Sequence, residues 1–458
     1  MKIIILGGGQ VGARVAENLV SDDNDIVVVD LDAALLKKLQ DRLDIQTVVG
    51  NAAHPSVLER AGAADCDMLL ALTRNDETNL AACKIAGSRF NIPTKIARIR
   101  ASDYVEYGGE GLLEEFMVDY AICPEQIVTH NLFRLFEYPG ALQVLDFADG
   151  RVQLVATQTL RGGLLVGREL RRIRQDLPEA NCRICAIDRE DSLILPTGNT
   201  EIQCDDEVFF LAQPDAVRDV LAELRKDDPP IRRVMIAGGG NIGFRLARLL
   251  EQAGYQVKVI DHGLERCRRL GEELEHALVL QGEATDEELL EAENIDEMDV
   301  FCALTNDDED NVMSALLAKR MGARRVIALV NRSSYVGLLE GHRIDIAVSP
   351  HLSTIGSILA HLRRGDVEAV HPLRGGSAEA MEVVIHGDVK TSRLVGRRID
   401  EIEMPQGCRI CALVRGDEVR MAHHDEVLAD GDHLIIFVSR RHQVREIEQL
   451  VQVKLGFF

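Results

Sequence analysis

The sequence predicts an α/β protein built from two parallel-sheet domains, each followed by a smaller α+β domain. Three observations carry this prediction. The segment GGGQVG at 7–12 returns as GGGNIG at 238–243. Runs of Val, Ile and Leu alternate with helical stretches in both halves, as they do where strands are buried on both faces. A second, shorter pair of repeats follows these regions, and such self-similarity indicates duplicated domains.

Each half offers five strands in the same order. Short apolar runs bounded by polar turns are typical of a parallel sheet that helices cover on both sides. The expected strands are 2–6, 26–29, 47–49, 68–72 and 95–99 in the first half, and 233–237, 257–260, 277–280, 300–304 and 326–330 in the second.

The repeated glycine segment has the spacing of a dinucleotide-binding turn. In G-x-G-x-x-G between a strand and a helix, the first glycine permits the turn and the second lets the backbone approach a pyrophosphate. The third allows helix and strand to pack closely. The phosphates then lie at the positive end of the helix. The predicted phosphate turns are Gly7, Gly8, Gly9, Gln10, Val11 and Gly12, and Gly238, Gly239, Gly240, Asn241, Ile242 and Gly243.

An aspartate lies 18 residues after the last glycine in both halves, at Asp30 and Asp261. A carboxylate at the end of the second strand accepts hydrogen bonds from ribose hydroxyls and repels the 2′-phosphate of NADP. It does not separate NAD from ATP or ADP. Ala13 and Arg14 follow the turn where a P-loop would carry lysine, so a P-loop NTPase is excluded. The sequence therefore predicts two Rossmann-like nucleotide sites.

Residues at the carboxyl ends of the later strands are further candidates, because ligands lie beyond those ends in such sheets. The first half has Arg74 and Arg98, where the second has Asn306 and Leu329. We therefore expect the first site to bind the dinucleotide more tightly; surface ion pairs are the alternative role of both arginines. The remaining candidates are Thr73 and Thr305, together with Asn51 and Glu283 in turns that either approach the adenine or are plain turns.

A charged, proline-rich segment at 226–231 is expected to separate the two halves. Amphipathic helices at 127–136 and 352–362 have two interpretations: each packs on its own domain, or each forms a contact face with another domain or subunit. The expected domains are 1–138 and 232–366 for nucleotide binding, with 139–226 and 367–458 as small C-terminal lobes.

The segment CRICA occurs twice in the small lobes and contains C-x-x-C motifs, Cys182/Cys185 and Cys408/Cys411. Zinc or redox chemistry is one interpretation. However, the segment reads as a strand, where residues three apart point to opposite faces. We therefore expect diverging thiols packed in the core, and no metal. His423 and His424 are interpreted as part of a solvated loop.

Composition excludes other classes of function. The net charge of −23 disfavours a nucleic-acid partner, which a basic face would attract. No apolar run approaches the ~18 residues that cross a bilayer, so we expect a cytosolic chain that reaches a membrane only through a partner. Neither Tyr-x-x-x-Lys nor G-x-S-x-G occurs. No acid, base or nucleophile can be named, and the sequence favours a protein that is not an enzyme.

The motifs resemble the TrkA family, the cytosolic nucleotide-binding subunits of Trk-type bacterial potassium uptake. The resemblance rests on GGGQVG with Asp30, on LTRNDETN and LVGREL, and on the doubling of the whole arrangement. It implies tandem domains of the type that regulates potassium conductance, with NAD(H) as ligand and ATP or ADP as further ligands. It carries the dinucleotide role to the glycines and aspartates of both halves, but to Thr73, Arg74 and Arg98 in the first half only.

The resemblance also implies an assembly. The chain would form a homo-oligomeric ring beneath an integral membrane potassium-translocating subunit, peripheral to the cytoplasmic side of the inner membrane. Ligand occupancy would change the shape of the ring and gate the pore. An NAD-dependent oxidoreductase of unrecognised type is the alternative, and a nucleotide buffer or scaffold is a third interpretation. Steady turnover of NADH would distinguish the oxidoreductase.

Overall fold

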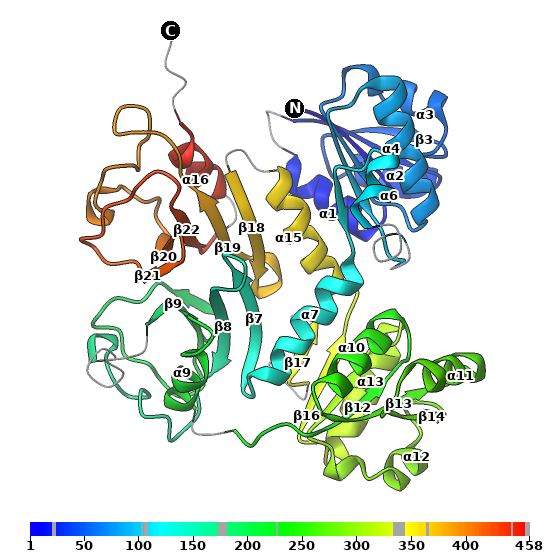
Figure 1. The fold of residues 1–458 in the computed structure, drawn as a ribbon, viewed down its shortest axis with the longest axis vertical. Coiled ribbons are helices and arrows are strands. Elements are labelled where there is room, and N and C mark those ends of the chain that lie inside the picture. The colour runs from blue at the N-terminus through cyan, green and yellow to red at the C-terminus, as the bar shows by residue number, and fades with distance from the viewer. Residues whose placement is uncertain are drawn as a thin grey trace. The chain divides into compact units, whose positions relative to one another are not determined.

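The structure is a computed structural model, in which the chain divides into two units (Figure 1). Residues 1–127 and 353–359 form the first unit, and residues 128–352 and 360–458 form the second. The start of the expected linker, at 226–227, lies outside the described residues. The structure describes all residues except 21–23, 102–103, 105–108, 173–180, 226–227, 333–343, 363–365, 441–442 and 454–458.

The first unit contains a six-stranded parallel sheet, drawn in blue to cyan in Figure 1. Its strand order is β3-β2-β1-β4-β5-β6. Strand β1 is central, and its residues 3–6 are all buried because helices cover both faces of the sheet. The strands are β1 Lys2–Leu6, β2 Asp25–Asp30, β3 Gln46–Val49, β4 Met68–Ala71, β5 Thr94–Arg98 and β6 Tyr120–Ile122. The helices are α1 Gln10–Leu19, α2 Ala33–Gln40, α3 Pro55–Arg60, α4 Asp76–Phe90 and α6 Gly109–Glu115, followed by α7 Pro124–Glu137, whose residues from Val128 onward belong to the second unit.

The second nucleotide-binding domain repeats this sheet in the order β14-β13-β12-β15-β16-β17. Its core contains the buried strand residues Met235, Ile260 and Phe301. The strands are β12 Arg233–Ala237, β13 Gln256–Asp261, β14 Leu278–Gln281, β15 Val300–Ala303, β16 Arg325–Leu329 and β17 Ile346–Val348. The helices are α10 Asn241–Gln252, α11 Leu264–Glu273, α12 Glu287–Ala292, α13 Asp308–Arg320 and α15 Pro350–Leu362.

All ten predicted strands are present, within one residue of the expected bounds. Each sheet has a sixth strand that was not predicted from the sequence. Strands β6 and β17 are three residues long and lie at the sheet edge, so they form no apolar run that stands out in the sequence. The prediction of two tandem parallel-sheet domains is confirmed.

Each small lobe is a five-stranded antiparallel sheet followed by a closing helix, which confirms the predicted small α+β lobes. The strand orders are β10-β9-β11-β8-β7 and β18-β19-β22-β20-β21. The first lobe contains β7 Ala141–Phe147, β8 Val152–Gln158, β9 Cys182–Arg189, β10 Ser192–Ile194, β11 Glu207–Ala212 and α9 Val217–Leu224. The second contains β18 Asp366–Leu373, β19 Ala378–Val384, β20 Cys408–Arg415, β21 Glu418–Met421, β22 His433–Val438 and α16 Val444–Val451.

The two small lobes share one hydrophobic core. Phe209 of the first lobe and Phe437 of the second have ring centroids 6.1 Å apart. The lobes also exchange hydrogen bonds reciprocally, since the Arg183 guanidinium donates to the carbonyl of Ala422 and that of Arg409 to the carbonyl of Pro196. The duplication within one chain therefore builds an internal pseudo-symmetric pair of lobes.

Helix α7 packs against the second nucleotide-binding domain and not only against its own half. Phe136 is 2% exposed, and its ring meets that of Tyr255 edge-on at 5.9 Å. The Tyr255 hydroxyl donates to the carbonyl of Phe136 at 3.2 Å. Residues 353–359 of α15 likewise belong to the unit of the first domain. Of the two interpretations, the contact face between domains is the correct one for α7. None of the described helices is long and apolar enough to cross a membrane.

We expect Phe136→Ala to destabilise the second unit by about 3–5 kcal/mol, because it removes a buried aromatic ring and leaves a cavity. Tyr255→Phe is the matched control. It keeps both rings and removes one hydrogen bond, so its cost should be about 1 kcal/mol. Urea unfolding followed by circular dichroism would measure both. Equal effects of the two substitutions would contradict the packing role given to Phe136.

Candidate nucleotide-binding sites

The three glycines of the first turn occupy three different environments, which match the three roles expected of them. Gly7 has a φ of 103°, in the region that favours glycine. A Cβ on Gly12 would lie 1.9 Å from the carbonyl oxygen of Gly7, so no side chain fits between helix α1 and the turn. A Cβ on Gly9 would meet nothing within 4 Å, which leaves open space where a pyrophosphate would approach.

The second turn reproduces this geometry. Gly238 has a φ of 103°, and a Cβ on Gly243 would lie 1.9 Å from the Gly238 carbonyl oxygen. Space is again open at Gly240. Helices α1 and α10 both start directly after the middle glycine, and neither has a side-chain cap at that residue. The glycine thus does not cap the backbone N–H groups in the first turn of either helix. An anion site requires such uncapped N–H groups.

Each turn lies where the order of the strands reverses, between the ends of β1 and β4 or of β12 and β15. Gly7 approaches the backbone of Leu72 and Thr73, which follow β4. Gly238 approaches Leu304 and Thr305 in the same way. Ligands of open α/β sheets bind at this switch point. The structure therefore brings each glycine turn together with the predicted threonine of the same domain.

Asp30 ends β2 and holds the glycine turn. Its Oδ2 accepts a hydrogen bond from the backbone N–H of Gly8 at 2.6 Å, and its Oδ1 accepts one from Asp32 at 2.9 Å. The residue is only half-buried. Leu31, which follows it, is 72% exposed and offers an apolar surface beside the predicted ribose site. The sequence analysis did not select Leu31, because an isolated apolar residue after a strand carries no signal by itself.

Asp261 holds the second turn in the same way, but its carboxylate has a further partner. Oδ2 accepts from Gly239 and Oδ1 from Gly263, both at 2.8 Å. The Arg266 guanidinium Nη1 lies 3.0 Å from Oδ2 and 3.3 Å from Oδ1. Burial favours the neutral acid, yet the backbone hydrogen bonds and Arg266 outweigh it and lower the pKa of Asp261 below its usual value.

The second ribose acid is therefore already neutralised within the protein. The Asp261 side chain is 2% exposed, and Arg266 covers it from helix α11. The equivalent position in the first domain is Leu35, which has no charge. This difference was not predicted, because Arg266 and Leu35 lie in the helix after the acid and outside the glycine turns and strand ends that indicate a nucleotide site.

Two buried asparagines fix the predicted threonines. Asn79 is fully buried, and its Oδ1 accepts from the backbone N–H of Thr73 at 3.0 Å and from the hydroxyl at 2.6 Å. Its Nδ2 donates to the carbonyl of Arg98 at 2.8 Å. Asn311 makes the same bonds in the second domain, to Thr305 and to the carbonyl of Leu329. These asparagines were not among the predicted site residues. Each one joins the ends of two strands by hydrogen bonds beneath the predicted nucleotide site.

Arg98 is buried at the end of β5, where its Nε has no hydrogen-bond partner in the described part of the chain. Burial and the nearby guanidinium of Arg100 lower the pKa of Arg98 to about 10. Arg74 contributes a smaller repulsion, so the two predicted arginines lie within electrostatic reach of each other. Arg74 itself is exposed. A buried cation with an unused donor fits an anionic ligand, and neither arginine has a counterpart in the second domain.

The other predicted residues lie at the turns that follow the strands. Asn51 is half-buried and its Oδ1 accepts from the backbone N–H of Ala53 at 2.9 Å, as in a local turn. Glu283 and Asn306 are exposed. His423, His424 and Asp425 place potential ligand atoms within 4.8 Å of one another, but two of the three residues are exposed, as in a solvated loop.

Comparison with known proteins gives the family. The TrkA-N domain model matches residues 3–124 and 234–350, and the TrkA-C domain model matches 161–225 and 388–451. The Trk system potassium uptake protein TrkA of Halomonas elongata is 52% identical over 458 residues, covering 100% of both chains. The protein of the same name from Vibrio alginolyticus is 50% identical over 454 residues, covering 99% of each.

Two solved structures share the fold. The crystal structure of the GsuK RCK domain superposes with a TM-score of 0.62 at 19% identity, covering 98% of this chain and 94% of that one. The GsuK channel bound to NAD gives a TM-score of 0.61 at 19% identity, covering 98% and 78%. Because both domain models match twice and two full-length relatives are at least 50% identical, the chain belongs to the TrkA family of potassium-uptake regulators, which are not enzymes.

Proposed function

We propose that this chain is a nucleotide-binding regulatory subunit that gates a membrane potassium-uptake transporter. Its ligands are NAD(H) and, at the same sites, ATP or ADP. It assembles as a homo-oligomeric ring on the cytoplasmic side of the inner membrane and is held there by an integral membrane potassium-translocating subunit. The full-length similarity to Trk system proteins supports the transport role. The fold shared with the GsuK channel bound to NAD supports NAD(H) as the ligand.

The single observation that carries this proposal is the pair of glycine turns at 7–12 and 238–243. In each turn, an aspartate carboxylate accepts a hydrogen bond from the backbone of the second glycine. Pyrophosphate would bind over Gly9 and Gly240, and ribose would bind Asp30 and Asp261. In the first site, Thr73, Arg74 and Arg98 would complete the pocket, with Asn51 near the adenine. In the second, Thr305, Asn306 and Glu283 take these positions without any positive charge.

Gating follows from differential affinity. A ligand shifts a two-state equilibrium only by the difference between its affinities for the two states. A cleft that closes around a dinucleotide supplies such a difference, and several clefts in a symmetric ring bias one shared transition. Helix α7 joins the first half to the second nucleotide domain through Phe136 and Tyr255. A change in one domain thereby has a packed route to the next.

Potassium flux through reconstituted membrane subunit and regulator would test the proposed function. We expect addition of NADH, NAD or ATP to change the flux only when the regulator is present. Steady consumption of NADH by the isolated regulator with small carbonyl substrates would favour the alternative, an oxidoreductase. Failure of the regulator to co-purify with any integral membrane protein would contradict the proposed partner.

We expect Asp30→Ala to weaken NADH binding at the first site by about 10- to 100-fold, because a hydrogen bond to a charged group contributes about 1.5–3 kcal/mol. Asp261→Ala is the matched control and should leave the first site unchanged. Calorimetric titration of both variants would separate the two sites. Equal affinity of the two wild-type sites would contradict the stronger first site that Arg74 and Arg98 predict.

We expect Arg266→Leu to strengthen nucleotide binding at the second site by up to about fivefold. The substitution removes the partly exposed ion pair between Arg266 and Asp261, and a ribose must compete with Arg266 for that carboxylate. Such ion pairs typically contribute up to about 1 kcal/mol. The reciprocal Leu35→Arg should weaken the first site. Weaker binding after Arg266→Leu would instead mean that Arg266 contacts the ligand.

A further inference from the structure

The C-x-x-C motifs of the small lobes contain a feature that the nucleotide sites do not explain. In the pairing of β9 with β11, Phe209 lies opposite Ala186 and Phe210 opposite Ile184, so Cys185 is the extra residue of a bulge. In the second lobe Ile436 lies opposite Ile410 and Ile435 opposite Ala412, so Cys411 is the extra residue there. A bulge redirects side chains relative to the regular alternation of a strand.

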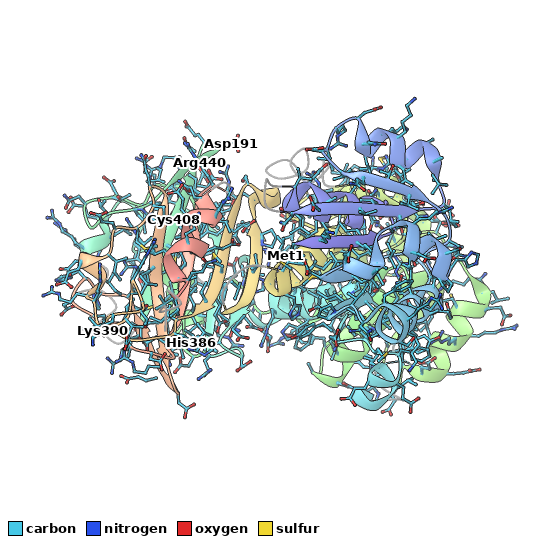
Figure 2. All side chains as sticks on the ribbon, turned by 90° about the horizontal axis from the view of Figure 1, so that it is seen from above. Met1, Asp191, His386, Lys390, Cys408 and Arg440 are labelled. Atoms are coloured by element: carbon cyan, nitrogen blue, oxygen red, sulfur yellow. The ribbon has the colours of Figure 1, made fainter. Side chains whose placement is uncertain are left out.

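The bulges turn the second cysteine of each motif toward the other lobe. Cys185 and Cys411 are both fully buried in the core that the two lobes share. Cys182 packs against a different core, which confirms that the thiols within the first motif diverge. Figure 2 shows Cys408, the first cysteine of the second motif, at the start of β20.

Cys185 and Cys411 hold equivalent positions on the neighbouring strands β9 and β20 and are both buried in this shared core. Each thiol donates to a backbone carbonyl of its own strand, Cys185 to that of Arg183 and Cys411 to that of Arg409, both at 3.6 Å. The neighbouring Cys185 thiol and the nearby guanidiniums of Arg183 and Arg409 lower the pKa of Cys411 against the effect of burial. Burial raises the pKa of Cys185. The pair therefore has one sulfur poised to ionise first and one that keeps its proton.

We propose that Cys185 and Cys411 are a modification site, at which a hydroperoxide oxidises them to an intramolecular disulfide that joins the two small lobes. The Cys411 thiolate attacks a peroxide oxygen, the O–O bond breaks, and a sulfenic acid and hydroxide form. The Cys185 sulfur then attacks the sulfenic sulfur. The S–S bond forms as hydroxide leaves, and the Cys185 proton converts it to water.

For hydrogen peroxide the balance is two thiols and one peroxide giving one disulfide and two waters. Two electrons pass from the sulfurs to the peroxide oxygens. A small dithiol reverses the reaction by thiol–disulfide exchange. Because both sulfurs are buried, the oxidant enters when the lobes separate locally, and the reaction is expected to be slower than oxidation of an exposed thiol.

The cross-link would constrain the part of the chain that contains the second nucleotide site. Cys185 and Cys411 are 226 positions apart, and the whole of β12 to β17 lies between them. A disulfide that closes a long loop restricts the unfolded chain and holds the lobes together. Oxidation would thereby prevent any movement that requires the two lobes to separate, independently of nucleotide binding.

The test uses the full-length protein treated with hydrogen peroxide, alkylated under denaturing conditions and digested with trypsin without reductant. Cleavage after Arg183 and Arg409 separates Cys185 from Cys182 and Cys411 from Cys408. The expected product is the peptide ICAIDR disulfide-bonded to ICALVR, detected by mass spectrometry and lost after dithiothreitol. Two of the ten thiols should disappear from the thiol count.

Cys182→Ser and Cys408→Ser are the matched controls, since each removes the other cysteine of a motif, and both should keep the cross-link. Cys185→Ser and Cys411→Ser should abolish it. Oxidation of other thiols in folded wild type without the ICAIDR–ICALVR product would overturn the proposal. The wild-type result decides whether the proposal holds even if a variant fails to fold. Circular dichroism of the oxidised wild-type protein shows whether that protein was still folded.

Discussion

The approach of helix α1 to the turn before it is the constraint on which the first site depends. The space between Gly12 and the Gly7 carbonyl is too small for a single carbon atom, so the helix can start at this point only if that residue is glycine. The same contact recurs between Gly243 and Gly238. By fixing where the helix begins, it fixes where the uncapped N–H groups point, and therefore where an anion binds.

The acids have two functions that cannot be separated. Asp30 and Asp261 accept hydrogen bonds from the turn itself, through Gly8 and Gly239, as well as offering oxygen atoms to a ribose. An ionised carboxylate in this position stabilises the glycine loop before any ligand arrives, which lowers the cost of ordering it on binding. The two domains differ in what else the acid meets, and Arg266 is the clearest difference between them.

Much of the fold was predictable because its signals are local. A strand, a glycine turn, a helix and an acid lie within about thirty residues, and their spacing recurs in the second half. Asn79 was missed because an asparagine near a helix start reads as a cap, and only the structure shows it joining Thr73 to the carbonyl of Arg98. The partner of α7 was open for the same reason: an amphipathic stripe shows that a helix is buried but not against what.

Duplication explains why the unpredicted features are also the ones that couple the domains. Two copies in one chain have equivalent surfaces, so the two small lobes can pack face to face as if they were separate subunits, with Phe209 against Phe437. Because the two copies have the same fold, each can exchange charged residues without loss of that fold. Arg98 and Leu329, at the ends of equivalent strands, are an example. Under the proposed function, two sites of unequal affinity bias one shared equilibrium. By linkage, the weaker site then responds at ligand concentrations that already saturate the stronger one, so the regulator senses a wider range than either site alone.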